Sequence, residues 1–446
     1  MAGPMSAAAK LDGLLARVDR LDPGLNAFVH LDPAGARAAA RDSDARMLAG
    51  NARSPIEGIT LSIKDNILVR GLPATWGSRA FADFVPDVDE LPVARLREAG
   101  AVIVGKTNVP ELTLEGYTAN ELFGVTRNPW NADLTPGGSS GGAAASVAAG
   151  MVDAAIGTDG GGSIRRPASH TGLVGFKPST GRIPRIDGFP AILTDFETIG
   201  TLTTSVADAR ALLRVMQGPD ARDRRSLYQS AAPFGARRLR ILHIPRFGVS
   251  PVDPEVTSVT GDIARLLSSL DHDVRTGKVF FDLEELGRAW FAITRAGVAW
   301  LFQRHERLGR EAGAAARRMA AEGAAVTGAD YFAALDWAGA LRRRCAELFA
   351  EIDLILTPTA AALPWPAAQP YPTEIDGRPA GPRDHAVFTA WVNIAGLPAI
   401  SLPLGRSRDG LPIGIQLVAG FGADDALLDF AEDVCRRRTP TPLPPL

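Results

Sequence analysis

The chain has 446 residues, a formal charge of −2, 46% hydrophobic residues and 22% charged residues. These values are typical of a globular protein long enough to bury a large core, and they exclude the strongly basic surface of a nucleic-acid binder. The only cysteines, Cys345 and Cys435, exclude a disulfide framework and belong to no metal-binding motif.

Hydropathy gives no sign of a membrane segment. No apolar run reaches the roughly 18 residues that a membrane-spanning helix requires. The N-terminal residues also lack the apolar stretch and cleavage site of a signal peptide. We therefore expect a cytoplasmic protein that binds neither membrane nor nucleic acid.

Helices and strands are expected to alternate along the first half of the chain. Apolar periodicity predicts two N-terminal helices and then a short strand that ends at Lys64. The expected ranges are helices 7–21 and 34–48, strand 59–63, helix 92–99, strand 101–104, a helix of small residues at 142–150 and strand 154–157. Such alternation predicts an α/β architecture.

The second half adds a long helical region and a final pair of strands. The expected ranges are a polar loop at 217–237, strand 239–244, helix 254–269, helices within 284–350, strand 354–356, an irregular Pro-rich stretch at 360–384, strands 399–403 and 414–418, and helix 424–437. No repeat or flexible linker is evident, so one domain is expected over 1–446. Its parts are an N-terminal helical arm (about 7–50), a core (about 56–216), a helical insert (about 284–350) and a C-terminal sheet and helix (about 351–438).

Two glycine-containing segments match common motifs but lack their context. Residues 100–107 fit the phosphate-loop pattern, yet their apolar middle predicts a strand and Pro110 follows where a helix should begin. Residues 137–141 fit the GxSxG nucleophile elbow around Ser139, yet a turn precedes them instead of a strand. An ATP site is therefore not expected. A His-dependent esterase using Ser139 stays as an alternative, with the downstream candidates His243, His272, His305 and His385.

A third segment has three consecutive glycines, Gly160, Gly161 and Gly162, directly before Ser163. Glycines allow the backbone to turn several amide N–H groups toward one point, as an oxyanion hole requires. Taken alone, such a segment favours a flexible polar turn over an oxyanion hole, so its interpretation depends on the motifs around it.

Together, the two glycine–serine segments resemble the core of the amidase signature family. Residues 136–142 (PGGSSGG) and 157–168 (GTDGGGSIRRPA) carry this resemblance, and residues 61–66 (LSIKDN) resemble the lysine motif of the family. Further matching segments are 105–108, 127–130, 175–178, 393–399 and 410–417. The resemblance extends over about 10–435, weakly within 240–350. It implies a single large α/β/α sandwich with a central twisted mixed β-sheet covered by helices.

The resemblance also implies roles for individual residues. Ser163 would be the nucleophile, and Ser139, after a cis peptide bond, would connect Ser163 to a neutral Lys64 that acts as the base. The amides of Gly160, Gly161, Gly162 and Ser163 would form the oxyanion hole, supported by Ser140, Asp159 and Arg165. No cofactor and no metal are implied.

Physical chemistry makes these implied roles reasonable. A serine hydroxyl is a weak nucleophile until a base accepts its proton. A free lysine has a pKa of about 10.4 and is charged at neutral pH, but burial disfavours the ammonium form. The apolar strand that ends at Ile63 would supply such burial for Lys64.

The favoured function is hydrolysis of the C–N bond of a small amide. Ala386 stands three residues before Thr389, where we expect an Asp in the glutamine-hydrolysing subunit of tRNA-dependent amidotransferases. That subunit, which passes ammonia to a partner's substrate, is the alternative. The expected substrate pocket, suited to an amide with an aromatic or apolar portion, contains Thr113, Leu114, Glu115, Phe388 and Trp391. The resemblance to the amidase signature family also implies a homodimer.

Overall fold

The computed structural model describes residues 6–227, 231, 233–235 and 238–446. The expected loop at 217–237 therefore lies partly outside the described residues, and its described part includes a single-turn 3-10 helix at Arg224–Ser226. Within these ranges no helix combines the length and the apolarity needed to cross a membrane.

Eleven strands form one central sheet, in the order β1-β3-β2-β6-β8-β7-β14-β15-β11-β9-β10. Their bounds are β1 (Phe28–Leu31), β2 (Thr60–Lys64), β3 (Val102–Thr107), β6 (Ala154–Asp159), β7 (Val174–Lys177), β8 (Thr198–Thr203), β9 (Arg240–His243), β10 (Asp273–Thr276), β11 (Leu354–Pro358), β14 (Ala399–Arg406) and β15 (Pro412–Ala419). The sheet is mixed, because β2 pairs in parallel with β3 and β6, and β9 with β10 and β11, whereas the other pairs are antiparallel. The α/β prediction is confirmed.

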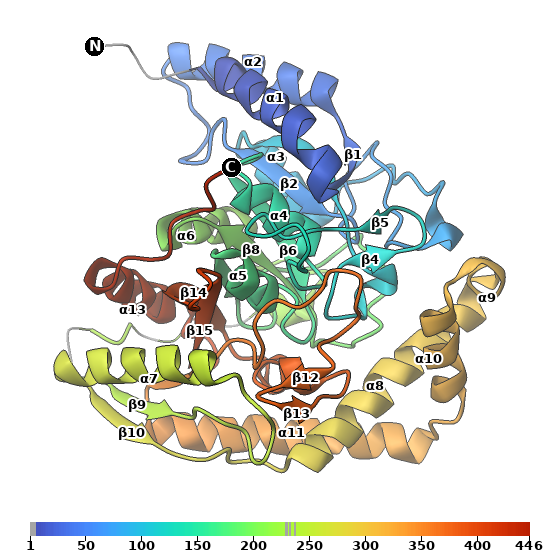
Figure 1. The fold of residues 1–446 in the computed structure, drawn as a ribbon. Helices are drawn as coiled ribbons and strands as arrows, with labels where there is room; N and C mark the ends of the chain where they lie inside the picture. The colour runs from blue at the N-terminus through green and yellow to red at the C-terminus, as the bar shows by residue number, and fades with distance from the viewer. Residues whose placement is uncertain (1–5, 228–230, 232, 236–237) are drawn as a thin grey trace.

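Helices cover the sheet, as Figure 1 shows, with α1 and α2 at the top of the view and α11 along the bottom. The helix bounds are α1 (Ala7–Leu25), α2 (Pro33–Leu48), α3 (Leu91–Glu98), α4 (Gly141–Ala148), α5 (Arg165–Thr171), α6 (Val206–Met216), α7 (Pro254–Ser269), α8 (Leu283–Arg304), α9 (Glu306–Glu311), α10 (Ala314–Ala324), α11 (Gly328–Glu351), α12 (Ala390–Ala395) and α13 (Asp424–Arg437). The region expected to be helical at 284–350 is thus four helices. The Pro-rich stretch contains a short hairpin of β12 (Glu374–Ile375) and β13 (Arg378–Pro379), and β4 (Ala119–Asn120) pairs with β5 (Gly124–Val125).

Strand alternation sorts the core onto two faces of the sheet. In β2, Leu61 and Ile63 pack in a cluster with α3, α6 and α13, whereas Ser62 points the other way and its hydroxyl lies 2.9 Å from that of Ser146 in α4. Every residue of α4 is buried, because its glycines and alanines allow close approach to the sheet. Lys64 ends β2 on the Ser62 side, and α4 begins two residues after Ser139. The candidate site therefore lies on the face of the sheet that α4 covers.

The segment that matches the phosphate-loop pattern forms a strand of the central sheet. Residues Val102–Thr107 form β3, and the fully buried Lys106 forms an ion pair with Asp65 at 3.6 Å. The segment is thus a central strand and not a phosphate loop.

Candidate active site

Lys64 and Ser139 are brought into direct contact. The Lys64 Nζ lies 2.8 Å from the Ser139 Oγ, and the two side chains are 0% and 1% exposed. The Gly138–Ser139 peptide bond is cis, as the resemblance implies. Gly138 tolerates no side chain, since a Cβ there would lie 2.3 Å from the Tyr117 carbonyl oxygen. Close packing thus holds the serine against the end of β2.

The surroundings of Lys64 favour its neutral form. Burial lowers the pKa of Lys64 to about 7, although the more distant charges of Glu197 and Asp159 partly oppose this effect. Lys64 forms no ion pair with any carboxylate in the described part of the chain. Its other partners are the Thr158 Oγ1 at 2.9 Å and the Thr158 carbonyl oxygen at 3.2 Å. A large share of Lys64 is therefore uncharged at neutral pH.

Ser163 is tied to the Ser139 segment through the main chain. The Ser140 amide donates to the Ser163 carbonyl oxygen at 3.1 Å, and the Ser140 hydroxyl donates to the Thr158 carbonyl oxygen at 3.2 Å. Ser163 is 7% exposed and precedes α5. Among the described residues, no side-chain hydrogen bond joins Ser139 to Ser163 in this state. The structure thus shows the first contact of the expected relay and not the second.

The glycine loop corrects one expectation about the oxyanion hole. The Gly162 amide already donates to the Asp159 Oδ1 at 2.7 Å, so it is not free to bind an oxyanion. The amides of Gly160, Gly161 and Ser163 have no acceptor within the described ranges. Gly162 instead supplies the turn, with a φ of 108° and a virtual Cβ 2.3 Å from the Thr389 Oγ1.

A buried ion pair holds this loop in place. The Asp159 carboxylate accepts from the Arg165 Nε at 3.0 Å and Nη2 at 2.8 Å, and also from the Ile164 amide at 3.1 Å. Burial by itself would raise the pKa of Asp159, but the Arg165 charge and these hydrogen bonds outweigh it and hold that pKa well below its usual value. Arg165 also donates to Asn393 at 2.6 Å and to Gln416 at 2.7 Å. These contacts fix the conformation of the glycine loop, and the supporting roles of Asp159 and Arg165 in catalysis stay a prediction.

Replacing Asp159 by Ala is expected to lower the free energy of unfolding by about 3–5 kcal/mol, because Arg165 would remain buried without its carboxylate. Thermal or urea unfolding measures this change. Asp12 pairs with Arg37 at the surface, where both side chains are exposed, and offers a matched control. Asp12→Ala should cost less than about 1 kcal/mol. Similar losses in the two variants would contradict the bracing role.

Three expected pocket residues lie at or directly after a strained turn. Leu112 and Thr113 both have left-handed φ values, 52° and 58°, and the Thr113 Oγ1 accepts from the Trp76 Nε1 at 3.2 Å. Thr113, Leu114 and Glu115 are half-buried. Burial raises the pKa of Glu115, and the positive charges of Arg383 and Arg295 partly oppose this rise. Glu115 forms no ion pair with a described residue.

The other two expected pocket residues belong to the core. Phe388 and Trp391 are 0% exposed, and the Trp391 Nε1 donates to the Phe388 carbonyl oxygen at 3.0 Å. Their rings pack against Phe247, Phe280 and Phe281. The placement of these two side chains in a substrate pocket was therefore wrong: they fill the layer behind the site.

Two residues without a sequence signal border the oxyanion loop instead. A Cβ on Gly161 would lie 2.5 Å from the Trp290 ring, and a Cβ on Gly160 would lie 2.5 Å from the Leu193 Cδ1. Trp290 comes from α8, and the Arg383 guanidinium lies over its ring at 4.8 Å. Only the packing of the helical insert against the sheet brings Trp290 to this loop.

The described histidines form no pair with either serine. Within the described residues, neither Ser139 nor Ser163 has a hydrogen bond to a histidine side chain. Burial lowers the pKa of His170 to about 3 and also lowers that of His385 well below its usual value. The geometry thus disfavours the alternative of a His-dependent esterase.

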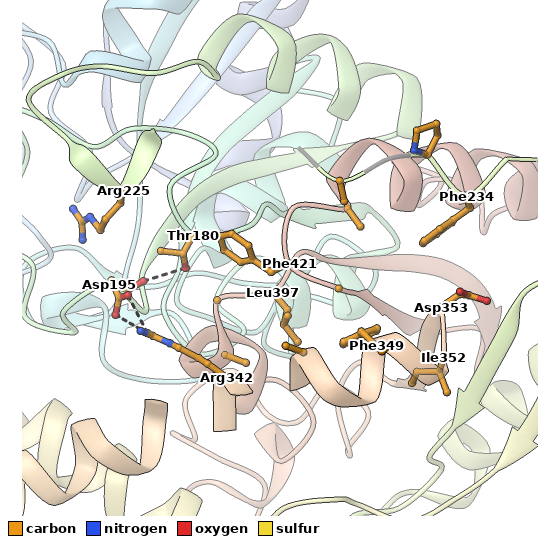
Figure 2. A pocket seen from close by; sticks show the side chains of 18 residues that line it. Thr180, Asp195, Arg225, Phe234, Arg342, Phe349, Ile352, Asp353, Leu397 and Phe421 are labelled. Carbon is orange, nitrogen blue, oxygen red and sulfur yellow. Dashed lines mark hydrogen bonds and ion pairs between the residues drawn. The ribbon is translucent and has the colours of Figure 1, made fainter. Parts of the chain in front are cut away.

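One sizeable cavity is separate from the serines. It has a volume of about 880 Å³ and lies between α11 and the turns around Leu397 and Phe421. Figure 2 shows its apolar side chains and the Asp195–Arg342 ion pair at one end. Neither Lys64, Ser139 nor Ser163 lines it, so it is not the catalytic pocket.

A buried lysine in contact with a serine, with a second serine on a glycine loop that has free amides, is an arrangement that can support acyl transfer. The family described as Amidase matches residues 10–428. The chain therefore belongs to this family, whose members include the amidase signature enzymes, and it is an amidase in the broad sense.

Known relatives differ in their stated activities. A glutamyl-tRNA(Gln) amidotransferase subunit from Chloroflexus aggregans is 34% identical, over 98% of this chain and 94% of the relative. A bacterial aryl acylamidase of the amidase signature family has a TM-score of 0.86 at 28% identity, over 96% of this chain and 93% of that chain. An inhibitor-bound vestigial complex related to the origins of an s-triazine catabolic enzyme has a TM-score of 0.90 at 27% identity, over 98% and 96% of the two chains. The mixed-sheet sandwich is thus the amidase signature fold.

Proposed function

We propose that the chain cleaves a carboxylic amide through an acyl-enzyme on Ser163. The observation that carries this proposal is the 2.8 Å contact between the Ser139 hydroxyl and a buried Lys64 that has no carboxylate partner among the described residues. As the Ser163 Oγ bonds to the amide carbon, its proton passes to Ser139 while the Ser139 proton passes to Lys64. The departing nitrogen then takes that proton as the C–N bond breaks, and water hydrolyses the ester.

The hydrogen bonds of Lys64 define the direction of this relay. A neutral amine has two N–H donors and one lone pair. Thr158 offers two acceptors to those donors, which leaves the lone pair for the Ser139 hydroxyl proton. Protonation would reverse the Lys64–Ser139 hydrogen bond and stop the relay, so activity should require neutral Lys64.

Amides of the glycine loop would stabilise the tetrahedral intermediate. The unpaired N–H groups of Gly161 and Ser163 are the best-placed donors, with Gly160 as a third candidate. Each such donor is worth about 3 kcal/mol of transition-state stabilisation. Asp159 excludes Gly162 from this set but keeps the loop rigid, which is what preorganised donors need.

The borders of the loop support an amide with an apolar or aromatic portion. Trp290 and Leu193 present apolar surface next to Gly161 and Gly160. Trp290→Ala is expected to lower kcat/KM for aryl amides at least about tenfold more than for acetamide, from lost aromatic contact. The exposed Trp300, also on α8, is the matched control. An unchanged ranking of substrates in the Trp290 variant would refute this assignment.

Glutamine hydrolysis within an amidotransferase is the second candidate, and the Chloroflexus aggregans relative favours it. The half-buried Glu115 and the cation Arg383 both lie near the loop without a direct ion pair between them. Together they could bind the ammonium and carboxylate groups of an amino acid. The absence of a carboxylate at Ala386 weighs against this candidate.

Ammonia release by the purified chain distinguishes the two candidates. We expect turnover of simple aliphatic and aryl amides by the chain alone, abolished in Ser163→Ala. Hydrolysis of glutamine but not of simple amides would instead establish the second candidate. So would activity that appears only with added amidotransferase partner subunits. No labelling of Ser163 by a fluorophosphonate would refute both.

A further inference from the structure

One buried arginine contacts the segments of both serines. Arg166 lies in the first turn of α5 and is 3% exposed. Its Nη2 donates to the Gly138 carbonyl oxygen at 3.2 Å, and its Nε lies 3.4 Å from the Gly162 carbonyl oxygen. The Arg166 amide also donates to that Gly162 oxygen, at 2.9 Å. The guanidinium thus connects the residue before Ser139 with the residue before Ser163.

The two contacted carbonyls have a special chemical position. The Gly138 C=O belongs to the same peptide unit as the Ser139 N–H, and the Gly162 C=O belongs to the same unit as the Ser163 N–H. A hydrogen bond from a cation to a carbonyl polarises the whole peptide unit and strengthens its N–H as a donor. At Ser163 this N–H is one of the amides free to bind an oxyanion.

Stability alone does not account for Arg166. It forms no ion pair with any described carboxylate, in contrast to its neighbour Arg165, which pairs with Asp159. A buried guanidinium without a carboxylate is costly, because carbonyl oxygens compensate its desolvation only in part.

A neutral histidine completes the environment of Arg166. The Arg166 Nη1 lies 3.3 Å from the His385 Nε2, and the Trp365 ring packs against His385 with a centroid distance of 4.8 Å. Burial and the nearby charges of Arg166 and Arg383 keep the pKa of His385 low, so its ring accepts the hydrogen bond. Gly116 is required here, since a Cβ would lie 2.2 Å from that nitrogen.

We propose that Arg166 is a positioning residue that keeps the Ser139 and Ser163 segments in register and strengthens the Ser163 amide as an oxyanion donor, with His385 orienting its guanidinium. This inference rests on the proposed acyl-enzyme function and adds a residue to it. Arg166 would act through peptide groups and touch no substrate.

Kinetics of Arg166→Ala with and without methylguanidine tests the inference. We expect kcat to fall about 10²–10³-fold, the loss typical of one oxyanion donor, with KM changed less than about threefold. Millimolar methylguanidine should restore at least a tenth of the lost kcat, and the rate of Ser163 labelling by a fluorophosphonate should fall and recover in parallel. Arg166→Lys keeps the positive charge but lacks the two-pronged guanidinium. Its kcat should lie between that of the unaltered protein and that of Arg166→Ala.

Arg95 is a matched control, because its Nη1 donates to the carbonyl oxygens of Met216, Gln217 and Gly218 at a place remote from the serines. Arg95→Ala should lower Tm without lowering kcat. If Arg166→Ala does not fold, His385→Phe and Arg166→Lys decide, with a kcat loss of at least about tenfold expected in each. Unchanged kcat in those variants, or a loss in Arg166→Ala that methylguanidine does not restore, would overturn the inference. Failure of the proposed function would show differently, as an absence of Ser163 labelling in the unaltered protein.

Discussion

Ser163→Ala is expected to abolish covalent labelling by a fluorophosphonate and to lower kcat by more than about 10⁴-fold, as loss of a catalytic serine does in other acyl-transfer enzymes. The Ser163 hydroxyl has no hydrogen bond within the described residues and is 7% exposed, so its loss should leave Tm almost unchanged. Intact-protein mass and peptide mapping would locate the label, and turnover of an amide would give kcat.

The neighbouring Ser140 provides the control for this experiment. Its hydroxyl donates to the Thr158 carbonyl oxygen, so Ser140→Ala should lower stability modestly and keep the label on Ser163. A label on Ser139, together with loss of activity in a single histidine variant, would instead establish the His-dependent esterase. A label that persists in Ser163→Ala would refute the assignment of the nucleophile.

Lys64→Met is expected to lower kcat by about 10³-fold or more, since the relay would lose its proton acceptor. It should also stabilise the protein. Each pKa unit by which burial lowers the Lys64 pKa corresponds to about 1.4 kcal/mol. Lost hydrogen bonds, at roughly 1 kcal/mol each, offset part of this gain. A net increase of about 2 kcal/mol in the free energy of unfolding is expected at pH 7.

The stability difference between the unaltered protein and Lys64→Met should depend on pH. The Lys64 pKa is about 7 in the folded protein and 10.5 without burial, so between these values the unfolded chain binds more protons. The unaltered protein therefore gains stability from Lys64 deprotonation as pH rises over that interval. Its stability deficit relative to Lys64→Met should be nearly constant below pH 7, shrink by about 1.4 kcal/mol per pH unit above it, and change sign before pH 10, where the hydrogen bonds of neutral Lys64 outweigh the remaining cost. In the unaltered protein, kcat/KM should rise through a pKa near 7.

Lys106 is the matched control, since it is equally buried but paired with Asp65. Lys106→Met would leave a buried carboxylate without its partner, and it should destabilise the protein by about 3–5 kcal/mol. Equal destabilisation by the two lysine variants would contradict a neutral Lys64. A pH profile without a transition near 7 would contradict its role as the base.

Local pattern was sufficient to predict much of the chain. Apolar alternation predicted the strand that ends at Lys64, and the run of glycine and alanine predicted the buried helix after Ser139. Helix periodicity predicted most of the long helices. These predictions succeeded because each pattern is contained within a short stretch of neighbouring residues. Shorter elements with mixed patterns, such as β8 and α12, were missed.

The sequence by itself determined the family, the α/β class and the candidates Lys64, Ser139 and Ser163, because those motifs are contiguous. Only the tertiary structure decided which amides stay free: three glycines permit a turn, but the position of the Asp159 carboxylate excludes the Gly162 amide. Tertiary packing also placed Phe388 and Trp391 in the core and Trp290 at the loop. Burial and long-range contacts depend on how distant segments meet, for which neighbouring residues carry no signal.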